Sequence, residues 1–405
     1  MRRIVAVLLS VLIAAGAVSL TGCKEDSGET FTFADTTYDY SVTEIVVKNK
    51  KISSVDELLS CSSLTALTLE DCDISDISEI SKLTSLKKLT LNNNKISDIS
   101  DVSKLTELQV LSLSGNNISD ITPVAALSKL TYLDVGKNPV DDLAPVAALA
   151  KLETLYADET NVTDITPIDT LKNLEELYLS YNKIMGFSAV TNLDNLRVLD
   201  LHASGLSGLG ILEELTDLRE LYIGENPDIE DFSAIAKLEK LEVLYAESDS
   251  ITDVSVFKDI PNLRVLYLTN DSIEDVTPLK NVSTLEELNI EGNYVVSKEN
   301  VGELISALPD CEVTHSDLKT ELELELLKPS SDTDIETDTD TETDTDTDTE
   351  TDSEDDEEED SDEDDEDNED EEEDEENGED SDTDTLTDGT TITTITTITE
   401  YVTVE

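Results

Sequence analysis

The fold is decided by the stretch Leu86–Ile99, LKKLTLNNNKISDI, whose pattern returns 22 residues later at Leu108–Ile121 as LQVLSLSGNNISDI. The shared frame is L-x-x-L-x-L-x-x-N-x-I-x-D-I. Its first position occurs twelve times between Val42 and Leu285, with one extra residue near Pro227. A fixed period of this length predicts a solenoid, in which each unit covers the apolar face of its neighbour.

Two parts of the frame predict local structure directly. The L-x-L segment is a short strand, because its alternation sends one set of side chains into the core. Cys72, Thr160 and Ser204 occupy the asparagine position in some copies. A buried side chain there can bond to the backbone of adjacent turns. The asparagines of this column are Asn94, Asn116, Asn138, Asn182, Asn226 and Asn293.

Thr-Pro pairs follow the frame in three copies, at Thr122, Thr166 and Thr277. A capping hydroxyl followed by proline at the first helical position is typical of a helix start. Only about six residues remain before the next strand, so we expect a 3₁₀ turn there and not a full α-helix.

The repeat resembles the leucine-rich-repeat family, specifically the 22-residue class of the bacterial internalins, over about Val42–Val313. The resemblance implies a curved solenoid with a parallel sheet on its concave face and short 3₁₀ turns on its convex face. Internalins begin with a helical cap, whereas Phe31–Tyr40 looks extended in this sequence. At the other end, the amphipathic stretch Val301–Leu308 and a closing strand at Cys311–Val313 are the expected cap.

Three cysteines follow Cys23, namely Cys61, Cys72 and Cys311. An odd number without a C-x-x-C spacing predicts neither a disulfide framework nor a zinc site. Cys61 and Cys72 both fall at inward positions of the repeat, so we interpret them as buried thiols.

The first 22 residues have the features of a secretory signal. Arg2 and Arg3 precede the apolar run Ile4–Ser19, which is too short to span a bilayer comfortably. The segment Leu20-Thr21-Gly22-Cys23 resembles the lipobox of bacterial lipoproteins, and an ordinary secretory signal is the alternative. The resemblance implies that Cys23 carries a diacylglyceryl group, and two acyl chains suffice for stable attachment. The protein is therefore predicted to be an extracytoplasmic, membrane-anchored lipoprotein at the cell envelope or surface.

The remaining boundaries follow from composition. The lipidated linker covers residues 23–41, the repeat domain 42–316 and a short connector 317–329. Residues 330–389 consist almost entirely of Asp, Glu, Thr and Ser, which predicts an extended, disordered arm with weak, diffuse binding of divalent cations. Residues 390–405 form a Thr/Ile-rich segment.

The charge excludes one class of partner. The net charge is −70, and 39 acidic residues lie from Ser330 onward with no Lys or Arg. Nucleic-acid binding rests largely on basic side chains that neutralise phosphates, so no nucleic acid is expected as a ligand.

Catalysis is poorly supported by the residues. His202 lies two residues from Asp200, but residues at that spacing share a strand face by geometry alone, and no nucleophile accompanies them. We therefore expect no enzyme activity, no cofactor and no metal site.

The residue between the two leucines of L-x-L should lie on the concave face, and this column becomes rich in tyrosine in the second half of the repeats. Tyrosine is a frequent hot-spot residue, because its body is apolar and its tip is polar. The alternative is that neighbouring rings merely stack on one another. With flanking positions added, the predicted ligand-binding residues are Tyr132, Tyr156, Asp158, Tyr178, Tyr181, Asp200, His202, Tyr222, Tyr245, Glu247 and Tyr267.

The sequence thus predicts an envelope-anchored binding module that recognises a partner macromolecule on its concave face. A protein is the preferred partner, and the acids beside the rings favour basic or hydroxyl-rich groups. Two alternatives stay open: a surface lipoprotein that binds a polysaccharide, and a structural spacer that displays the acidic arm.

Overall fold

The computed structural model describes residues 29–293 and 297–316. The predicted signal peptide, Cys23, the connector, the acidic arm and the Thr/Ile-rich segment lie outside these residues. Within the described ranges, no helix has both the length and the apolar character needed to cross a membrane.

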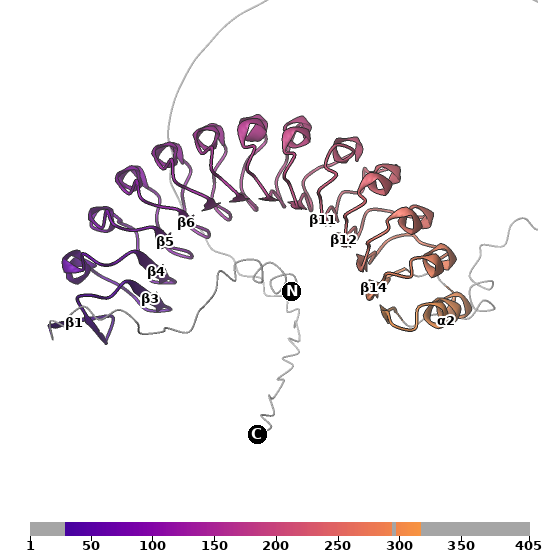
Figure 1. The fold of residues 1–405 in the computed structure, drawn as a ribbon, viewed down its shortest axis with the longest axis horizontal. Helices are drawn as coiled ribbons and strands as arrows, with labels where there is room; N and C mark the ends of the chain where they lie inside the picture. Colours follow the sequence, from indigo (N-terminus) through magenta and orange to yellow (C-terminus); the bar gives the residue numbers. More distant parts are fainter. Residues whose placement is uncertain (1–28, 294–296, 317–405) are drawn as a thin grey trace, which may run out of the picture. The chain divides into compact units, whose positions relative to one another are not determined.

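The predicted solenoid is confirmed. Thirteen parallel strands form one sheet in the order of the sequence, and Figure 1 shows them along the inner side of an arc. Their bounds are β3 (Glu44–Lys48), β4 (Ala66–Glu70), β5 (Lys88–Thr90), β6 (Val110–Ser112), β7 (Tyr132–Asp134), β8 (Thr154–Tyr156), β9 (Glu176–Tyr178), β10 (Val198–Asp200), β11 (Glu220–Tyr222), β12 (Val243–Tyr245), β13 (Val265–Tyr267), β14 (Glu287–Asn289) and β15 (Glu312–Thr314).

The register of the sheet preserves the sequence period. Leu111 pairs with Leu133, 22 residues further on, so that equivalent leucines lie side by side in the core. Between β11 and β12 the offset is one residue larger, because Leu221 pairs with Leu244. The extra residue predicted near Pro227 is therefore accommodated in the loop between these strands, without disturbing the sheet.

The outer side of the arc carries the predicted 3₁₀ turns (Figure 1). They are η1 (Asp56–Ser60), η2 (Ile80–Lys82), η3 (Ser100–Lys104), η4 (Thr122–Ala126), η5 (Ala144–Ala148), η6 (Thr166–Thr170), η7 (Ser188–Asn192), η8 (Gly210–Leu212), η9 (Ser233–Lys237), η10 (Ser255–Asp259) and η11 (Thr277–Asn281).

The prediction that Thr122, Thr166 and Thr277 cap these turns is wrong. Each is the first residue inside its turn, and the preceding cap position is apolar, with no side-chain bond. The aspartate of the D-I pair supplies the bond instead. At η10, Asp253 Oδ1 accepts the backbone N–H of Ser255 at 2.8 Å and Oδ2 accepts its hydroxyl at 2.9 Å. These two bonds hold the pKa of Asp253 below its usual value.

The asparagine column forms the predicted ladder along the solenoid. Asn138 Nδ2 donates to the carbonyl of Leu113 in the preceding turn at 3.0 Å and to that of Val135 in its own turn at 3.1 Å. Its Oδ1 accepts the N–H of Ile118 at 3.0 Å. Cys72 takes the same place, where its Sγ lies 3.3 Å from the Glu70 carbonyl. The side chains thereby satisfy backbone groups that the tight bend leaves unpaired.

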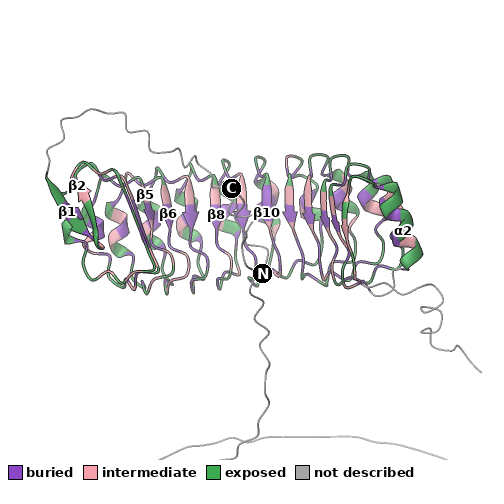
Figure 2. Cartoon of the chain, turned by 90° about the horizontal axis from the view of Figure 1, so that it is seen from below, coloured by how far each residue is buried: buried purple, intermediate pink, exposed green. Residues whose placement is uncertain are grey.

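Both ends of the solenoid are covered, as Figure 2 shows. The extended segment predicted at Phe31–Tyr40 is a hairpin of β1 (Thr30–Phe33) and β2 (Thr36–Asp39), which buries Phe31 and Phe33. At the far end, α2 (Lys298–Ala307) begins at Ser297, whose Oγ accepts the N–H of Asn300 at 3.1 Å. The strand β15 then pairs with β14, as predicted.

The three cysteines in the described residues are free thiols. Cys61 and Cys72 are buried, as the sequence predicted, and Cys311 is partly exposed.

Candidate functional site: the concave face

The concave face is built from the first and third residues of each three-residue strand, while the central leucine points into the core. Leu177 and Leu221 are fully buried in this way. Because parallel strands pair in register, equivalent residues form continuous columns across the face. The tyrosines of the third position therefore meet as neighbours.

The first tyrosine cluster is largely buried. Tyr132 and Tyr156 have ring centroids 5.6 Å apart, and Tyr156 lies on Tyr178 at 4.0 Å with the planes 5° apart. Tyr156 is 8% exposed and Tyr178 is 4% exposed, and both pack against Val198. These two predicted ligand-binding rings are on the concave face but are closed to solvent, because each ring covers its neighbour one strand away. Stacking within this first cluster is the alternative that the sequence left open.

The second tyrosine cluster is partly exposed. Tyr222 and Tyr245 stack at 4.9 Å, and Tyr245 and Tyr267 stack at 4.3 Å, with planes within 21° of parallel. Tyr222 donates its hydroxyl to Glu220 Oε2 at 2.9 Å, and Tyr267 donates to Glu287. Burial, followed by these carboxylates, raises the pKa of both tyrosines, so their hydroxyls stay protonated donors.

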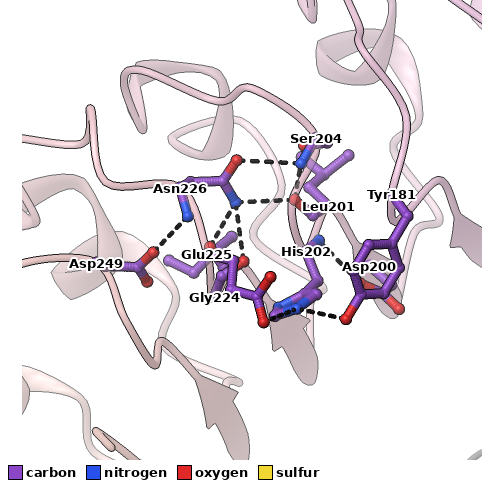
Figure 3. Close-up of polar contacts among 10 residues, drawn as sticks. Tyr181, Asp200, Leu201, His202, Ser204, Gly224, Glu225, Asn226 and Asp249 are labelled. Carbon is purple, nitrogen blue, oxygen red and sulfur yellow. Dashed lines mark hydrogen bonds and ion pairs between the residues drawn. The ribbon is translucent and has the colours of Figure 1, made fainter. Parts of the chain in front are cut away.

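Asp200 takes the third strand position between Tyr178 and Tyr222, although Tyr222 still packs against the first cluster. A polar group lies beside Asp200 (Figure 3). Its Oδ1 accepts the backbone N–H of His202 at 3.0 Å. The buried imidazole of His202 has its Nε2 3.1 Å from the Tyr181 hydroxyl and 3.2 Å from Glu225 Oε1. Tyr181 is 48% exposed and meets His202 edge to face at 5.0 Å. This arrangement orients Tyr181 at the rim of the face.

Tyr181 and Glu225 belong to a column of left-handed backbone at the end of each strand turn, with φ of 57° and 60°. Such angles favour Gly, Asn and Asp, so other residue types there carry strain. The column is Asn49, Asp71, Asn93, Gly115, Lys137, Glu159, Tyr181, Ala203, Glu225, Ser248, Asn270 and Gly292. A rim tyrosine in this position is held by the repeat geometry and not by a flexible loop.

Asp158 and Glu247 each lie over a glycine of the preceding turn. A Cβ at Gly136 would lie 2.7 Å from Asp158 Oδ1, and one at Gly224 would lie 2.9 Å from Glu247 Oε2. Burial raises the pKa of Asp158, and Glu247 is 6% exposed. Both carboxylates therefore lie close against the backbone of the preceding turn.

Sequence reasoning missed the carboxylates that hold the tyrosine hydroxyls. Glu176, Glu220 and Glu287 occupy the first strand position, and Glu176 Oε2 accepts from Tyr178 at 3.4 Å. The sequence contained a signal, because two strands share the sequence Glu-Leu-Tyr: Glu176-Leu177-Tyr178 and Glu220-Leu221-Tyr222. Residues two apart on a strand share a face, which places the acid beside the ring.

In the first half of the concave face the side chains are smaller and more polar. Ser112 donates to Asp134 Oδ2 at 2.8 Å, and both side chains are buried. Burial raises the pKa of Asp134 to about 6. Within the described ranges, no group of three or more His, Cys, Asp or Glu side chains is arranged to hold a metal ion. The second half therefore offers the aromatic surface available to a ligand.

Comparison with known proteins agrees with this geometry. Residues 41–186 match the family described as leucine-rich repeat region. The crystal structure of an internalin, InlF, from Listeria monocytogenes is 31% identical, with a TM-score of 0.62, and the similarity covers 72% of this chain and 88% of that one. Internalin C2 of the same organism is 30% identical over 52% of this chain and 83% of its own, with a TM-score of 0.39.

A more distant structure shares the fold alone. The receptor TLR13, solved in complex with ssRNA13, is 20% identical over 64% of this chain and 41% of its own, with a TM-score of 0.51. No curated protein matches the chain at a significant level.

Proposed function

We propose that this chain, which belongs to the internalin-like family of leucine-rich-repeat proteins, binds a protein partner on the second half of its concave face. The observation that carries the proposal is the second tyrosine cluster, Tyr222, Tyr245 and Tyr267, which is stacked yet partly exposed. Rings that are already ordered lose little entropy on binding, which is a property of hot-spot tyrosines.

The stacking favours a protein over a polysaccharide. Sugars bind aromatic residues by lying on the face of a ring, but both faces of Tyr245 lie against Tyr222 and Tyr267. Stacking on both faces leaves the edge and the hydroxyl end of Tyr245 as the parts that a ligand can reach. Edges and hydroxyls suit the mixed apolar and polar groups of a protein surface.

Charge indicates the chemistry of that partner. The carboxylates Glu220 and Glu287 hold the tyrosine hydroxyls, and Glu225 lies exposed at the rim. The whole chain carries a net charge of −70. A partner that presents Lys or Arg side chains is therefore attracted, and a nucleic acid is repelled.

The proposal includes attachment to the cell envelope through a lipid on Cys23, and it assigns the protein to binding and not to catalysis. The support for the anchor is the lipobox-like segment Leu20–Cys23 after a signal-like apolar run. A tether of this kind leaves the solenoid free to meet partners outside the cytoplasm.

Site-specific photo-crosslinking tests the proposal. The full chain carries the crosslinker in place of Tyr267, at the open edge of the cluster, or in place of Lys129 on an exposed convex position as the matched control. We expect a defined protein adduct from position 267, competed by excess unlabelled chain. An adduct pattern that is the same at both positions would exclude the concave face as the binding site.

A further inference from the structure

The ladder column that follows the strands normally places a hydrogen-bond donor inside the solenoid. Asn226 Nδ2 donates to the carbonyls of Leu201 at 2.9 Å and Gly224 at 3.3 Å (Figure 3). Where the column is not asparagine, Thr160 Oγ1 donates to the Ala157 carbonyl and Ser204 Oγ to the Leu201 carbonyl. Side chains of different chemistry thus serve the same function, which is to give a proton to a buried backbone carbonyl.

Asp249 and Asp271 are the two ladder positions where a carboxyl group takes this place. Their Oδ1 atoms behave like the amide oxygen of asparagine. Asp249 Oδ1 accepts the N–H of Asn226 at 2.7 Å, and Asp271 Oδ1 accepts those of Asp249 at 2.9 Å and Ile251 at 3.1 Å. Each Oδ2 therefore occupies the place of the amide nitrogen, which in the other turns faces carbonyl oxygens.

Both Oδ2 atoms are buried and have no hydrogen-bond partner among the described residues. Asp249 is fully buried, and Asp271 is 7% exposed. An ionised carboxylate is acceptor-only, so it cannot bond to a carbonyl, whereas a protonated one carries an O–H donor. Leaving a charged acceptor buried without a donor is costly.

We propose that Asp249 and Asp271 are held as neutral carboxylic acids in the folded solenoid, and that losing these protons as the pH rises loosens the turns of β12 and β13. The neutral acid has nearly the shape of the asparagine amide, so it completes the ladder. The ionised form breaks the ladder at two adjacent turns, which are the turns that present Tyr245 and Tyr267.

The surroundings of the two groups oppose ionisation. Burial raises the pKa of Asp249 to about 8, and the carboxylates of Asp271 and Glu225 add to that rise, while the Asn226 N–H opposes it. Burial raises the pKa of Asp271 to about 6, against three backbone N–H bonds. Glu247, two residues before Asp249, is also buried, and no Lys or Arg in the described ranges pairs with either aspartate.

The direction of the pH effect follows from proton counting. Between roughly pH 4, the ordinary pKa of Asp, and the raised values, the folded chain binds more protons than the unfolded chain. The contribution of the pair is thus fully present below about pH 4 and is lost progressively as the pH rises from 4 toward 8.

The test compares three forms of the full chain: wild type, the Asp249→Asn, Asp271→Asn variant, and a control with Asp228→Asn and Glu230→Gln. The control removes two exposed carboxylates, so it matches the number of acidic groups that are removed. Thermal melting midpoints are measured from pH 5 to pH 8 at constant ionic strength. At pH 8 the double asparagine variant should melt at least about 4 °C above the control, and this gap should shrink toward pH 5.

Side-chain NMR of the wild-type chain measures the protonation of Asp249 directly, so the test does not depend on how well the variant folds. The carboxyl ¹³C shift of Asp249 is followed with pH in the wild-type chain. A midpoint above about 5 supports the neutral acid, and a midpoint at the ordinary value near 4 overturns it. A melting gap that is absent, or that is equal at pH 5 and pH 8, overturns the proposal as well.

Discussion

Replacing Tyr178 with alanine should destabilise the solenoid by about 3 kcal/mol. The ring is 4% exposed and stacks on Tyr156 at 4.0 Å with nearly parallel planes. Burial of roughly 100 Å² of apolar ring surface is worth about 2.5 kcal/mol at about 25 cal/mol per Å². An aromatic pair in this geometry adds about 0.5–1.5 kcal/mol, and relaxation of the open face offsets part of the sum.

The assay is urea denaturation of the full chain, followed by far-ultraviolet circular dichroism. Tyr181→Ala is the control, because Tyr181 is 48% exposed and should cost no more than about 1 kcal/mol. In a double-mutant cycle, Tyr156→Ala and Tyr178→Ala should show a coupling of about 0.5–1.5 kcal/mol. Equal losses for Tyr178→Ala and Tyr181→Ala would refute the conclusion that the buried first cluster stabilises the fold more than an exposed rim tyrosine does.

Three further predictions concern other parts of the chain. Cys23→Ala should release the protein from membranes and abolish labelling by a palmitate analogue, and unchanged partitioning would contradict the lipid anchor. Leu133→Ala should cost about 2–5 kcal/mol in a denaturant melt, because this leucine is fully buried, while Thr90→Ala on the concave face should cost less than about 1 kcal/mol. Asp253→Ala should lower the melting temperature at pH 7. Because the folded-state pKa of Asp253 is depressed, that difference should shrink as the pH falls below about 4, and a difference independent of pH would argue against the cap.

Most of the fold was predictable because the repeat frame specifies it locally. The leucines and the asparagine column determine each turn, and the 22-residue period sets the register, as the pairing of Leu111 with Leu133 confirms. The cap was predicted wrongly at Thr122, because hydroxyl residues are generally preferred as caps. The capping residue is Asp120, two residues earlier, whose Oδ1 accepts the Thr122 N–H.

The candidate site was predictable only as a set of columns. The frame places Tyr178 and Tyr222 on the same face, but it does not say how far each ring leans onto its neighbour. Ring spacing alone does not set burial, since Tyr156 and Tyr178 lie 4.0 Å apart and Tyr245 and Tyr267 lie 4.3 Å apart. Tyr156 and Tyr178 are also packed with Val198, a contact that the repeat frame does not specify. The neutral state inferred for the Asp249 carboxyl group could not be predicted from the sequence either. It depends on the backbone groups that surround the side chain and not on the spacing of the repeat.

Binding of a protein partner by the second tyrosine cluster is decided by two measurements made on the same variants. A binding isotherm and a thermal melt are recorded for two double variants, with the partner that the crosslinking experiment identifies. One variant carries Tyr222→Ser and Tyr245→Ser, and the convex control carries Lys104→Ala and Lys129→Ala. The tyrosine variant should lose at least about 2 kcal/mol of binding free energy while keeping a cooperative melt, and the control should bind as wild type does. Intact affinity together with a collapsed melt would show that these tyrosines serve the fold alone, and it would contradict the claim.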